Sequence, residues 1–284
     1  MSEVSEMAQR EAGLLGDTVA RDYSAKLSRF NAFAKAELCG LISSMNLKPG
    51  MHVLDMGCGT GEALNWLSHE VAPSGRVVGV DLAAAHVAKA KQQTTPGIDV
   101  YQANLYDDLF ERGSFDFVWC VNTINHLTDP VGGVERLAAL LRDGGRIAIG
   151  QSSLLPDMYF AWDARLERAV NDAVRGYYRD RYKLGEDDLR AVRSLLGVVR
   201  AAGFRSVGVR SIMIERMSPL DSPSESYLRE SIFQGTWGER LRPYLPHSDF
   251  QELAALCDPK HANYALRRRD FHFLQSFTLV TGTA

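Results

Sequence analysis

A glycine-rich turn and a carboxylate that follows it are the residues in this sequence best suited to chemistry. Gly57, Gly59 and Gly61 come directly after an apolar run at 52–56, and Asp81 ends the next apolar run. Glycines let a backbone turn tightly and come close to a ligand, and the free N–H groups of a following helix then point at that ligand. Asp81 follows Gly61 by 81 − 61 = 20 residues, the separation expected of a carboxylate that accepts hydrogen bonds from ribose hydroxyls. The sequence therefore predicts a nucleotide-cofactor site.

The spacing of the glycines distinguishes two classes of cofactor. A dinucleotide-binding turn reads G-x-G-x-x-G/A, whereas residues 57–61 read G-x-G-x-G, with Asp55 two residues before Gly57. An acidic side chain beside the turn would repel a pyrophosphate but could pair with an ammonium group. The pattern therefore disfavours a nicotinamide-dependent oxidoreductase, which we keep as a less favoured alternative.

A parallel α/β sheet is needed to position these residues, and strand and helix patterns do alternate along the first half of the chain. The predicted strands are 52–56, 76–80, 98–102, 115–121 and 146–150. The predicted helices between them are 62–71, 83–93 and 134–141. Strands that alternate with helices in this way form βαβ units and a parallel sheet.

Outside this alternation the chain reads as helical, with two further strands. Residues 20–45 carry apolar groups at helical spacing and predict an amphipathic helix, and 154–203 read as long charged helices. Segments 206–216 and 271–281 are rich in β-branched and aromatic residues and predict strands. The intervening 218–270 contains five prolines and is too long for a plain loop, so we expect an inserted cap of short helices.

The ordered motifs resemble those of a known family. Residues 53–61, VLDMGCGTG, look like the first motif of class I S-adenosylmethionine (SAM)-dependent methyltransferases, and Gly79-Val80-Asp81 looks like their second. Segments 104–110 and 113–116 resemble the family's adenine-contacting segment and fourth strand, and 141–146 its turn after the helix. The resemblance covers about residues 50–150 and is to the ubiquinone/menaquinone-methyltransferase-like, small-molecule branch.

The resemblance implies an α/β fold class with a Rossmann-like, doubly wound, mixed seven-stranded sheet. Residues 1–48 would form an N-terminal helical lid, and 49–284 a SAM-binding methyltransferase domain. Substrate-covering insertions would lie at 154–203 and at 218–270, the latter a helical cap before the last strand.

SAM is the implied cofactor, with S-adenosyl-L-homocysteine (SAH) as the product. Asp55 and the glycine turn would hold the methionine part, Asp81 the ribose hydroxyls, and Leu82 would pack on the adenine. Asn104 stands where the family usually carries Asp for the adenine amino group, and its side-chain oxygen can accept that bond without charge. The cofactor-binding residues implied in this way are Asp55, Gly57, Cys58, Gly59, Gly61, Asp81, Leu82, Asn104, Leu105 and Asn122.

Two residues are candidates for catalysis. His126 follows the fourth strand, at the carboxyl ends of the strands where open α/β sheets bind ligands; it would act as a general base or be a hydrogen-bonded loop histidine. Tyr23 resembles the family's lid tyrosine, or is a core contact of its helix. Tyr177, Tyr178 and Trp237 would line an aromatic substrate pocket, or belong to the core. No metal site is expected.

The composition of this chain of 284 residues limits the classes of partner that it is expected to bind. Its 32 Lys and Arg against 35 Asp and Glu give a net charge of −3, which argues against a dedicated nucleic-acid or membrane-surface binder. The four scattered cysteines fit neither a disulfide framework nor a zinc site. Residues 1–17 lack a basic segment followed by an apolar one. We therefore expect a cytoplasmic protein without a nucleic-acid or membrane partner, and leave a homodimer open.

The functional hypothesis is methyl transfer from SAM to an O, N or electron-rich C atom of a small, aromatic or lipophilic secondary metabolite. A SAM-binding protein that transfers nothing, and acts as a regulator or scaffold, is the alternative from another class.

Overall fold

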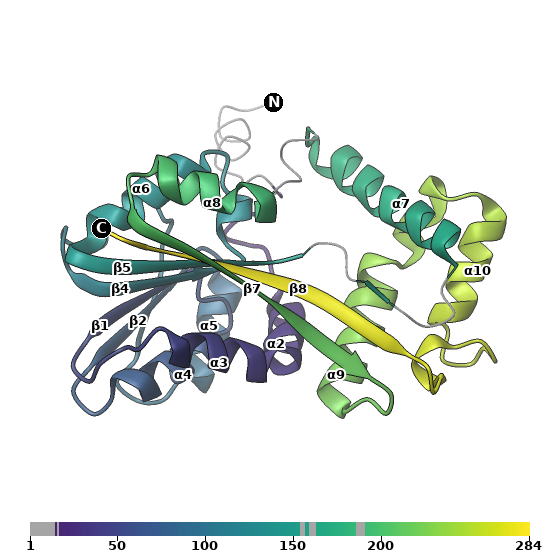
Figure 1. Cartoon of the computed structure of the whole chain (residues 1–284), viewed down its shortest axis with the longest axis horizontal. Coiled ribbons are helices and arrows are strands. Elements are labelled where there is room, and N and C mark those ends of the chain that lie inside the picture. Colours follow the sequence, from purple (N-terminus) through teal and green to yellow (C-terminus); the bar gives the residue numbers. More distant parts are fainter. Residues whose placement is uncertain (1–14, 16, 154–156, 159–162, 186–190) are drawn as a thin grey trace.

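One mixed sheet forms the centre of the computed structural model, which describes residues 15, 17–153, 157–158, 163–185 and 191–284. The strand order is β3-β2-β1-β4-β5-β8-β6, with β7 paired to β8 (Figure 1). The strands are β1 (His52–Met56), β2 (Arg76–Asp81), β3 (Asp99–Gln102), β4 (Phe115–Val121), β5 (Leu141–Ser152), β6 (Asp157–Met158), β7 (Arg205–Met217) and β8 (His272–Thr283). Strands β1 to β5 are parallel, whereas β8 is antiparallel to β5 and to β7. The predicted mixed seven-stranded sheet is confirmed, and the two-residue β6 adds a short eighth strand within the described residues.

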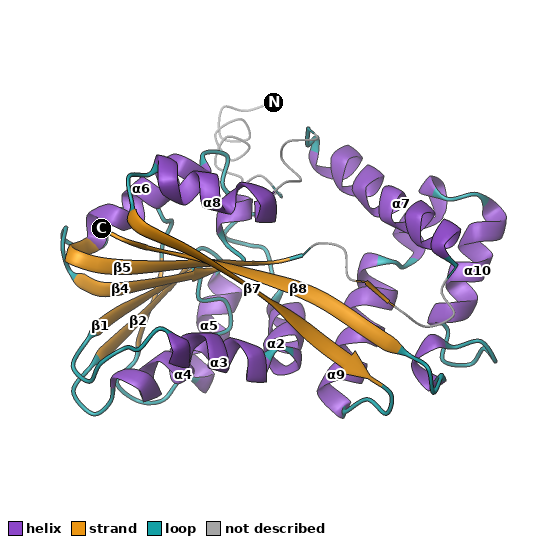
Figure 2. Ribbon diagram, viewed as in Figure 1, coloured by secondary structure: helices purple, strands orange, loops and turns teal. Residues whose placement is uncertain are grey.

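Helices cover both faces of the sheet because its central strands are apolar on both sides. Val53 and Leu54, neighbours in β1, point to opposite faces and belong to two separate cores. The helices α2 (Ser24–Phe33), α3 (Lys35–Ser44), α4 (Glu62–Val71) and α5 (Ala84–Gln93) contribute to the Val53 core. The helices α6 (Pro130–Leu140) and α8 (Ala191–Ala201) cover the opposite face (Figures 1 and 2).

The amphipathic helix predicted over 20–45 is two helices, α2 and α3, which meet at Ala34. Arg216 of β7 reaches this junction, donating from Nη2 to the Phe33 carbonyl and from Nη1 to Glu37 Oε1 at 2.7 Å. A carbonyl at a helix end needs a partner outside the helix, and Arg216 supplies it. The apolar spacing continues across the break, so the pattern alone does not reveal it.

Strands β7 and β8 extend beyond the rest of the sheet to a group of helices that we call the cap (Figure 1). The cap consists of α7 (Ala164–Tyr182), α9 (Ser222–Ser226), the π-helix η3 (Tyr227–Thr236), the 3₁₀ helices η4 (Glu239–Tyr244) and η5 (Ala265–Arg267), and α10 (His247–Cys257). The short helices expected between the last two strands are therefore present. Within 154–203, α7 packs on η4 and α10, whereas α8 packs on α6 and the sheet.

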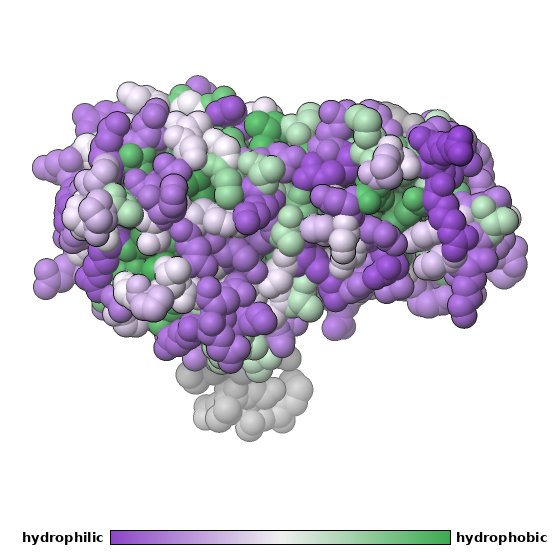
Figure 3. All heavy atoms as spheres, turned by 90° about the horizontal axis from the view of Figure 1, so that it is seen from below, coloured by the Kyte–Doolittle hydropathy of each residue, from purple (hydrophilic) through white to green (hydrophobic). Residues whose placement is uncertain are grey.

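No helix in the described ranges combines the length and the apolar character needed to span a membrane. Hydrophilic residues predominate on the face drawn in Figure 3, over the sheet domain and the cap alike. Large apolar side chains that reach solvent include Val209, Met213 and Met217 of β7. Exposed apolar residues of this kind are ordinary on a folded surface.

Candidate active site

The glycine turn between β1 and α4 has a backbone that glycine adopts readily and other residues do not. The φ angles of Gly57, Gly59 and Gly61 are 80°, 54° and 90°, all in the left-handed region. A Cβ on Gly57 would lie 2.0 Å from Thr123 Oγ1, so no side chain fits there. The N–H of Gly57 donates to the Val80 carbonyl at 2.7 Å, which holds the turn against the end of β2. The turn therefore presents bare backbone at the carboxyl ends of the strands.

Asp81 is held in place beside this turn by three donors. Its Oδ2 accepts from the Gly59 N–H at 2.9 Å, and its Oδ1 accepts from the Ala83 N–H at 2.9 Å. His86 Nδ1 lies 3.1 Å from Oδ1, while His86 Nε2 accepts from the Tyr23 N–H at 3.0 Å. Because Nε2 is the acceptor, Nδ1 carries the proton and donates to Asp81. A carboxylate offers about four lone-pair positions, so Asp81 keeps acceptor capacity for a ligand hydroxyl.

Asp55, at the end of β1, places a second, buried carboxyl group within electrostatic reach of Asp81. Only 3% of its surface is exposed, and within the part of the chain that the structure describes it forms no ion pair. Burial, followed by the negative charges of Asp81 and Glu62, raises the pKa of Asp55 well above its usual range. Burial would also raise the pKa of Glu62, but hydrogen bonds from Thr60, its own backbone and Asn31 hold it below its usual value. A buried carboxylate without a cation is costly, so this pocket favours a positively charged ligand group.

The residues predicted on the adenine side are engaged to different degrees. Asn104 Oδ1 accepts from the Tyr106 N–H at 3.1 Å, an Asx turn that leaves the oxygen one lone pair. Leu105 is buried and Leu82 half-buried. Cys58 is buried, and burial raises the pKa of its thiol well above the usual range. A thiol that stays protonated inside the fold supports packing rather than nucleophilic chemistry.

Asn122 joins the carboxyl ends of β4 and β5. Its φ is 53°, and its Oδ1 accepts from both the Ser152 N–H at 2.9 Å and the Ser152 hydroxyl at 3.1 Å. Its backbone N–H also donates to the Gly150 carbonyl at 2.8 Å, so what Asn122 offers a ligand is its backbone carbonyl and its side-chain NH₂ group.

The two candidate catalytic residues lie in one polar network. His126, in the 3₁₀ turn η1 (Ile124–His126), has its Nδ1 2.6 Å from Asp17 Oδ2. Asp17 also lies 3.8 Å from Arg21 Nη1. The Arg21 guanidinium sits 4.3 Å from the centre of the Tyr23 ring and donates from Nη2 to the Tyr182 hydroxyl at 2.9 Å. The segment before α2, the 3₁₀ turn η1 and the helix α7 are thus brought together.

The three predicted substrate residues belong to one hydrophobic cluster, in which Trp237 is buried and Tyr177 and Tyr178 are half-buried. Tyr177 and Tyr178 make an edge-to-face pair on α7, with ring centres 5.7 Å apart, and Tyr178 lies 5.8 Å from Tyr182. Trp237 is 3% exposed and stacks on Phe233 at 5.6 Å within the cap core. Acceptor contact by these three residues stays a prediction.

Comparison with known proteins agrees with this geometry. The family described as a methyltransferase domain matches residues 53–145. Nocamycin O-methyltransferase of Saccharothrix syringae is 30% identical over 216 residues, which cover 72% of this chain and 74% of that relative. The chain belongs to the class I SAM-dependent methyltransferase family. The ubiquinone biosynthesis O-methyltransferase of Xanthomonas axonopodis pv. citri is 34% identical over 180 residues, which cover 61% of this chain and 70% of that relative.

Other relatives are longer, and the solved structures support the fold. The chain spans about a third of the length of two uncharacterised relatives, from Streptomyces fradiae and a Synechococcus strain. The crystal structure of a SAM-dependent methyltransferase from Aquifex aeolicus matches with a TM-score of 0.50 at 20% identity, covering 68% of this chain and 93% of that one. That match shows a shared methyltransferase fold.

Sequence reasoning missed three residues around the candidate site. Asp17, Arg21 and His86 belong to no motif, and Asp17 is 109 residues from its partner His126. The one available signal was local: His86 follows Asp81 by five residues on the next helix, which brings it back toward the end of β2.

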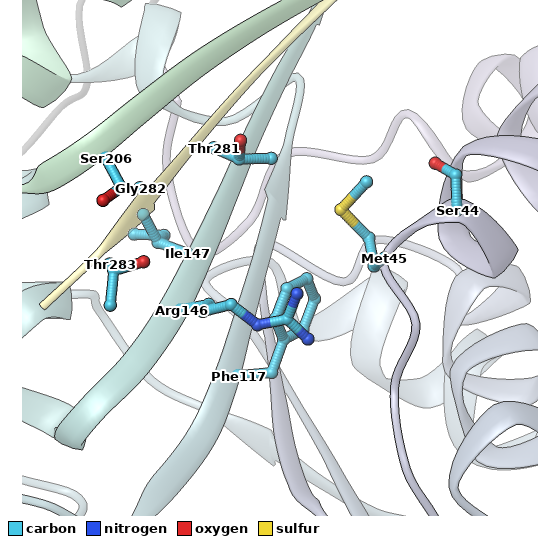
Figure 4. Close-up of a pocket in the computed structure, with 9 residues that line it drawn as sticks. All are labelled: Ser44, Met45, Phe117, Arg146, Ile147, Ser206, Thr281, Gly282 and Thr283. Carbon is cyan, nitrogen blue, oxygen red and sulfur yellow. The ribbon is translucent and has the colours of Figure 1, made fainter.

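A separate pocket of about 250 Å³ lies away from the methyltransferase motifs (Figure 4). It is lined by Phe117 and Arg146, near the amino ends of β4 and β5, and by residues at the end of β8 such as Thr281. The Arg146 guanidinium lies 5.7 Å from the centre of the Phe117 ring. Because ligands of open α/β sheets bind at the carboxyl ends of the strands, we do not assign this pocket to the cofactor.

Proposed function

We propose that this chain is an enzyme that transfers a methyl group from SAM to an oxygen, nitrogen or electron-rich carbon of a small aromatic or lipophilic metabolite. The observation that carries the proposal is the pairing of two carboxylates with the glycine turn. Buried Asp55 has no cation among the described residues, and Asp81 is fixed by three donors with capacity left over. SAM carries cationic groups suited to the first and ribose hydroxyls suited to the second.

SAM, when bound, supplies an activated methyl group on a positively charged sulfur. The protein has to bind that cofactor, hold the acceptor in line and exclude water. Leu27 of α2 contributes to the exclusion of water, because its Cδ1 lies 3.1 Å from where a Cβ on Gly59 would be. We therefore propose residues 1–48 as a lid on the domain 49–284, with parts of 154–203 and 218–270 covering the acceptor.

His126 is the proposed general base. With Nδ1 donating to Asp17 at 2.6 Å, its Nε2 keeps a lone pair that can accept a proton from the acceptor. Such a base is most useful for a hydroxyl acceptor, and the names of two relatives, nocamycin O-methyltransferase and ubiquinone biosynthesis O-methyltransferase, support O-methylation. Tyr23 lies beside this network and is proposed to cover the site.

The partners proposed for the enzyme are SAM and one small acceptor. The net charge of −3 supports the proposal that it binds neither nucleic acid nor a membrane surface. We further propose that it works in the cytoplasm, and that any self-association is as a homodimer.

Calorimetric titration of the full chain with SAH tests the cofactor site. We expect binding to wild type, a loss of about a hundredfold in affinity in Asp81→Ala, and severe weakening in Gly59→Val. Asp99→Ala is the matched control, since Asp99 lies at the start of β3 and forms a solvent-exposed ion pair with Arg76. Equal SAH affinity in wild type and Asp81→Ala would refute the proposed site.

Methyl transfer itself is tested with SAM labelled in the methyl group, incubated with a panel of phenols, carboxylates and amines. Label in a small-molecule product supports the enzyme. SAH binding without transfer to any fraction of a metabolite extract would favour a regulatory or scaffold protein. A change in NADH fluorescence on mixing would instead favour a nicotinamide-dependent oxidoreductase.

A further inference from the structure

Positively charged side chains and tyrosines converge between the lid and the cap. The cations are Arg21 and Lys26 of the lid and Arg240 of η4. The aromatic residues are Tyr177, Tyr178 and Tyr182 of α7. We call these six residues the cationic cleft.

A chain of ring and guanidinium contacts connects the two sides of the cleft. The Arg240 guanidinium lies 5.1 Å from the centre of the Tyr177 ring. The rings continue from Tyr177 to Tyr178 at 5.7 Å and to Tyr182 at 5.8 Å. Arg21 closes the row by donating to the Tyr182 hydroxyl at 2.9 Å. Lid and cap thus share one continuous row of rings and guanidinium groups.

Lys26 lies on α2 within electrostatic reach of both arginines. Burial, followed by the positive charges of Arg240 and Arg21, lowers the pKa of Lys26. Its side chain nevertheless stays open to solvent. The like charges of Lys26, Arg21 and Arg240 repel one another, and an anion bound among them would relieve that repulsion.

Two cations of the cationic cleft differ from the cap arginines that form ion pairs. Arg165, Arg229 and Arg242 lie 2.8 to 3.0 Å from Asp or Glu oxygens. Within the described ranges, neither Lys26 nor Arg240 has a carboxylate within 4.0 Å. Lys26 and Arg240 therefore carry positive charge that no carboxylate among the described residues balances by direct contact.

We propose that the cationic cleft binds an oxyanion of the methyl acceptor, a carboxylate or a phosphate, with the tyrosine rings packed around its apolar part. Guanidinium and ammonium groups are the usual partners of such oxyanions. Arg21 also contacts Asp17, the partner of His126, so an acceptor anchored here has its other end near the proposed base. The inference rests on the proposed methyltransferase function and assigns its acceptor to the anionic small molecules.

Binding to the SAH-loaded full chain tests this assignment with matched pairs of probes. The pairs are 3,4-dihydroxybenzoate with 3,4-dihydroxybenzamide, and phenyl phosphate with phenol. We expect the anionic member of at least one pair to bind at least about tenfold more tightly than its neutral partner. The carboxylate and phosphate arms distinguish the two sources of the oxyanion.

Variants locate the effect. Lys26→Gln and Arg240→Gln should each abolish most of the preference for the anion, while SAH affinity stays within about twofold of wild type. Arg242→Gln is the matched control, because Arg242 lies on the same helix η4 and is paired with Glu239; it should keep the preference.

The outcomes separate the two proposals. If SAH binds wild type but neither anion binds at millimolar concentration, or each pair binds equally, the cationic cleft is refuted while the cofactor site stands. The same holds if Arg242→Gln loses the preference as fully as Arg240→Gln. If SAH itself fails to bind, the methyltransferase function fails first.

Discussion

His86 Nδ1 donates to Asp81 Oδ1 at 3.1 Å, and this bond connects the proposed ribose carboxylate to the lid. The other ring nitrogen of His86 accepts from the Tyr23 N–H at 3.0 Å. His86 is buried, and its ring centre lies 6.1 Å from that of Tyr23. The imidazole thus holds the Asp81 rotamer and the start of α2 at the same time.

Replacing His86 should therefore weaken cofactor binding indirectly, because His86 is proposed to position Asp81 and not to contact the cofactor itself. We expect His86→Ala to lower SAH affinity by about tenfold, the effect of losing one hydrogen bond to a charged group. His86→Asn places an amide donor near Nδ1 and should recover much of that loss, because only the contact with Tyr23 is then missing. Calorimetry measures both, and His69→Ala, at an exposed position on α4, is the control. A His86→Asn variant as weak as His86→Ala would contradict the positioning role.

Asp55→Asn should have opposite effects on stability and on cofactor binding. Burial and the charges of Asp81 and Glu62 raise the pKa of Asp55 in the folded protein. Protonated Asp55 therefore contributes most to folding stability below its pKa in the unfolded chain, about 3.9. That contribution is lost as the pH rises through its pKa in the folded protein. Without cofactor, the free energy of unfolding of Asp55→Asn should therefore increase relative to that of wild type as the pH rises from 4 toward neutrality.

Urea unfolding without cofactor at several pH values measures that gain, at about 1.4 kcal/mol for each unit of raised pKa. SAM affinity in the same variant should fall, because the cation of the cofactor loses its carboxylate. A stability difference between the two proteins that does not change with pH would show that Asp55 ionises normally.

The parts of the site that could be predicted from sequence are those set within one βαβ unit. Gly57 to Gly61, Asp55 and Asp81 lie on neighbouring strands and their turn, so the strand pattern and the 20-residue spacing are enough to place them together. Their binding roles stay predictions. The alternation predicted the five parallel strands, and the mixed seven-stranded sheet that the family resemblance implied is confirmed.

Contacts between distant segments could not be predicted in this way. Asp17 and His126 are 109 residues apart, and no local pattern records which loop the N-terminal segment will reach. The aromatic residues of the cap show the same limit. Tyr178 and Trp237 both belong to aromatic-rich helical segments, yet Tyr178 packs beside Tyr182 and Trp237 stacks on Phe233. Spacing shows that a helix has an apolar face but not what packs on it.

Removing the proposed base should slow methyl transfer and leave cofactor binding intact. General-base catalysis contributes about 10²- to 10⁴-fold, so we expect kcat for a hydroxyl acceptor to fall by at least about a hundredfold in His126→Ala. Asp17→Asn should have a smaller effect, about tenfold, because Nδ1 loses its charged acceptor at 2.6 Å but the imidazole remains. Transfer of labelled methyl groups gives the rates and calorimetry the SAH affinity. An unchanged kcat in His126→Ala would make His126 a loop histidine.

Gly57→Ala should lower the free energy of unfolding more than Gly97→Ala, which adds backbone strain but no steric overlap. Gly57 has φ 80° and a Cβ there would lie 2.0 Å from Thr123 Oγ1, whereas Gly97 has φ 95° and open space within 4 Å. Both alanines should cost about 1 to 3 kcal/mol of strain, and Gly57→Ala about 2 kcal/mol more from overlap. Urea unfolding measures the two costs. Because the overlapping atoms include Oγ1 and Cγ2 of Thr123, adding Thr123→Ala should restore part of the stability of Gly57→Ala and none of that of Gly97→Ala. Equal stability costs of the two alanine substitutions would instead show that the turn can move away from Thr123.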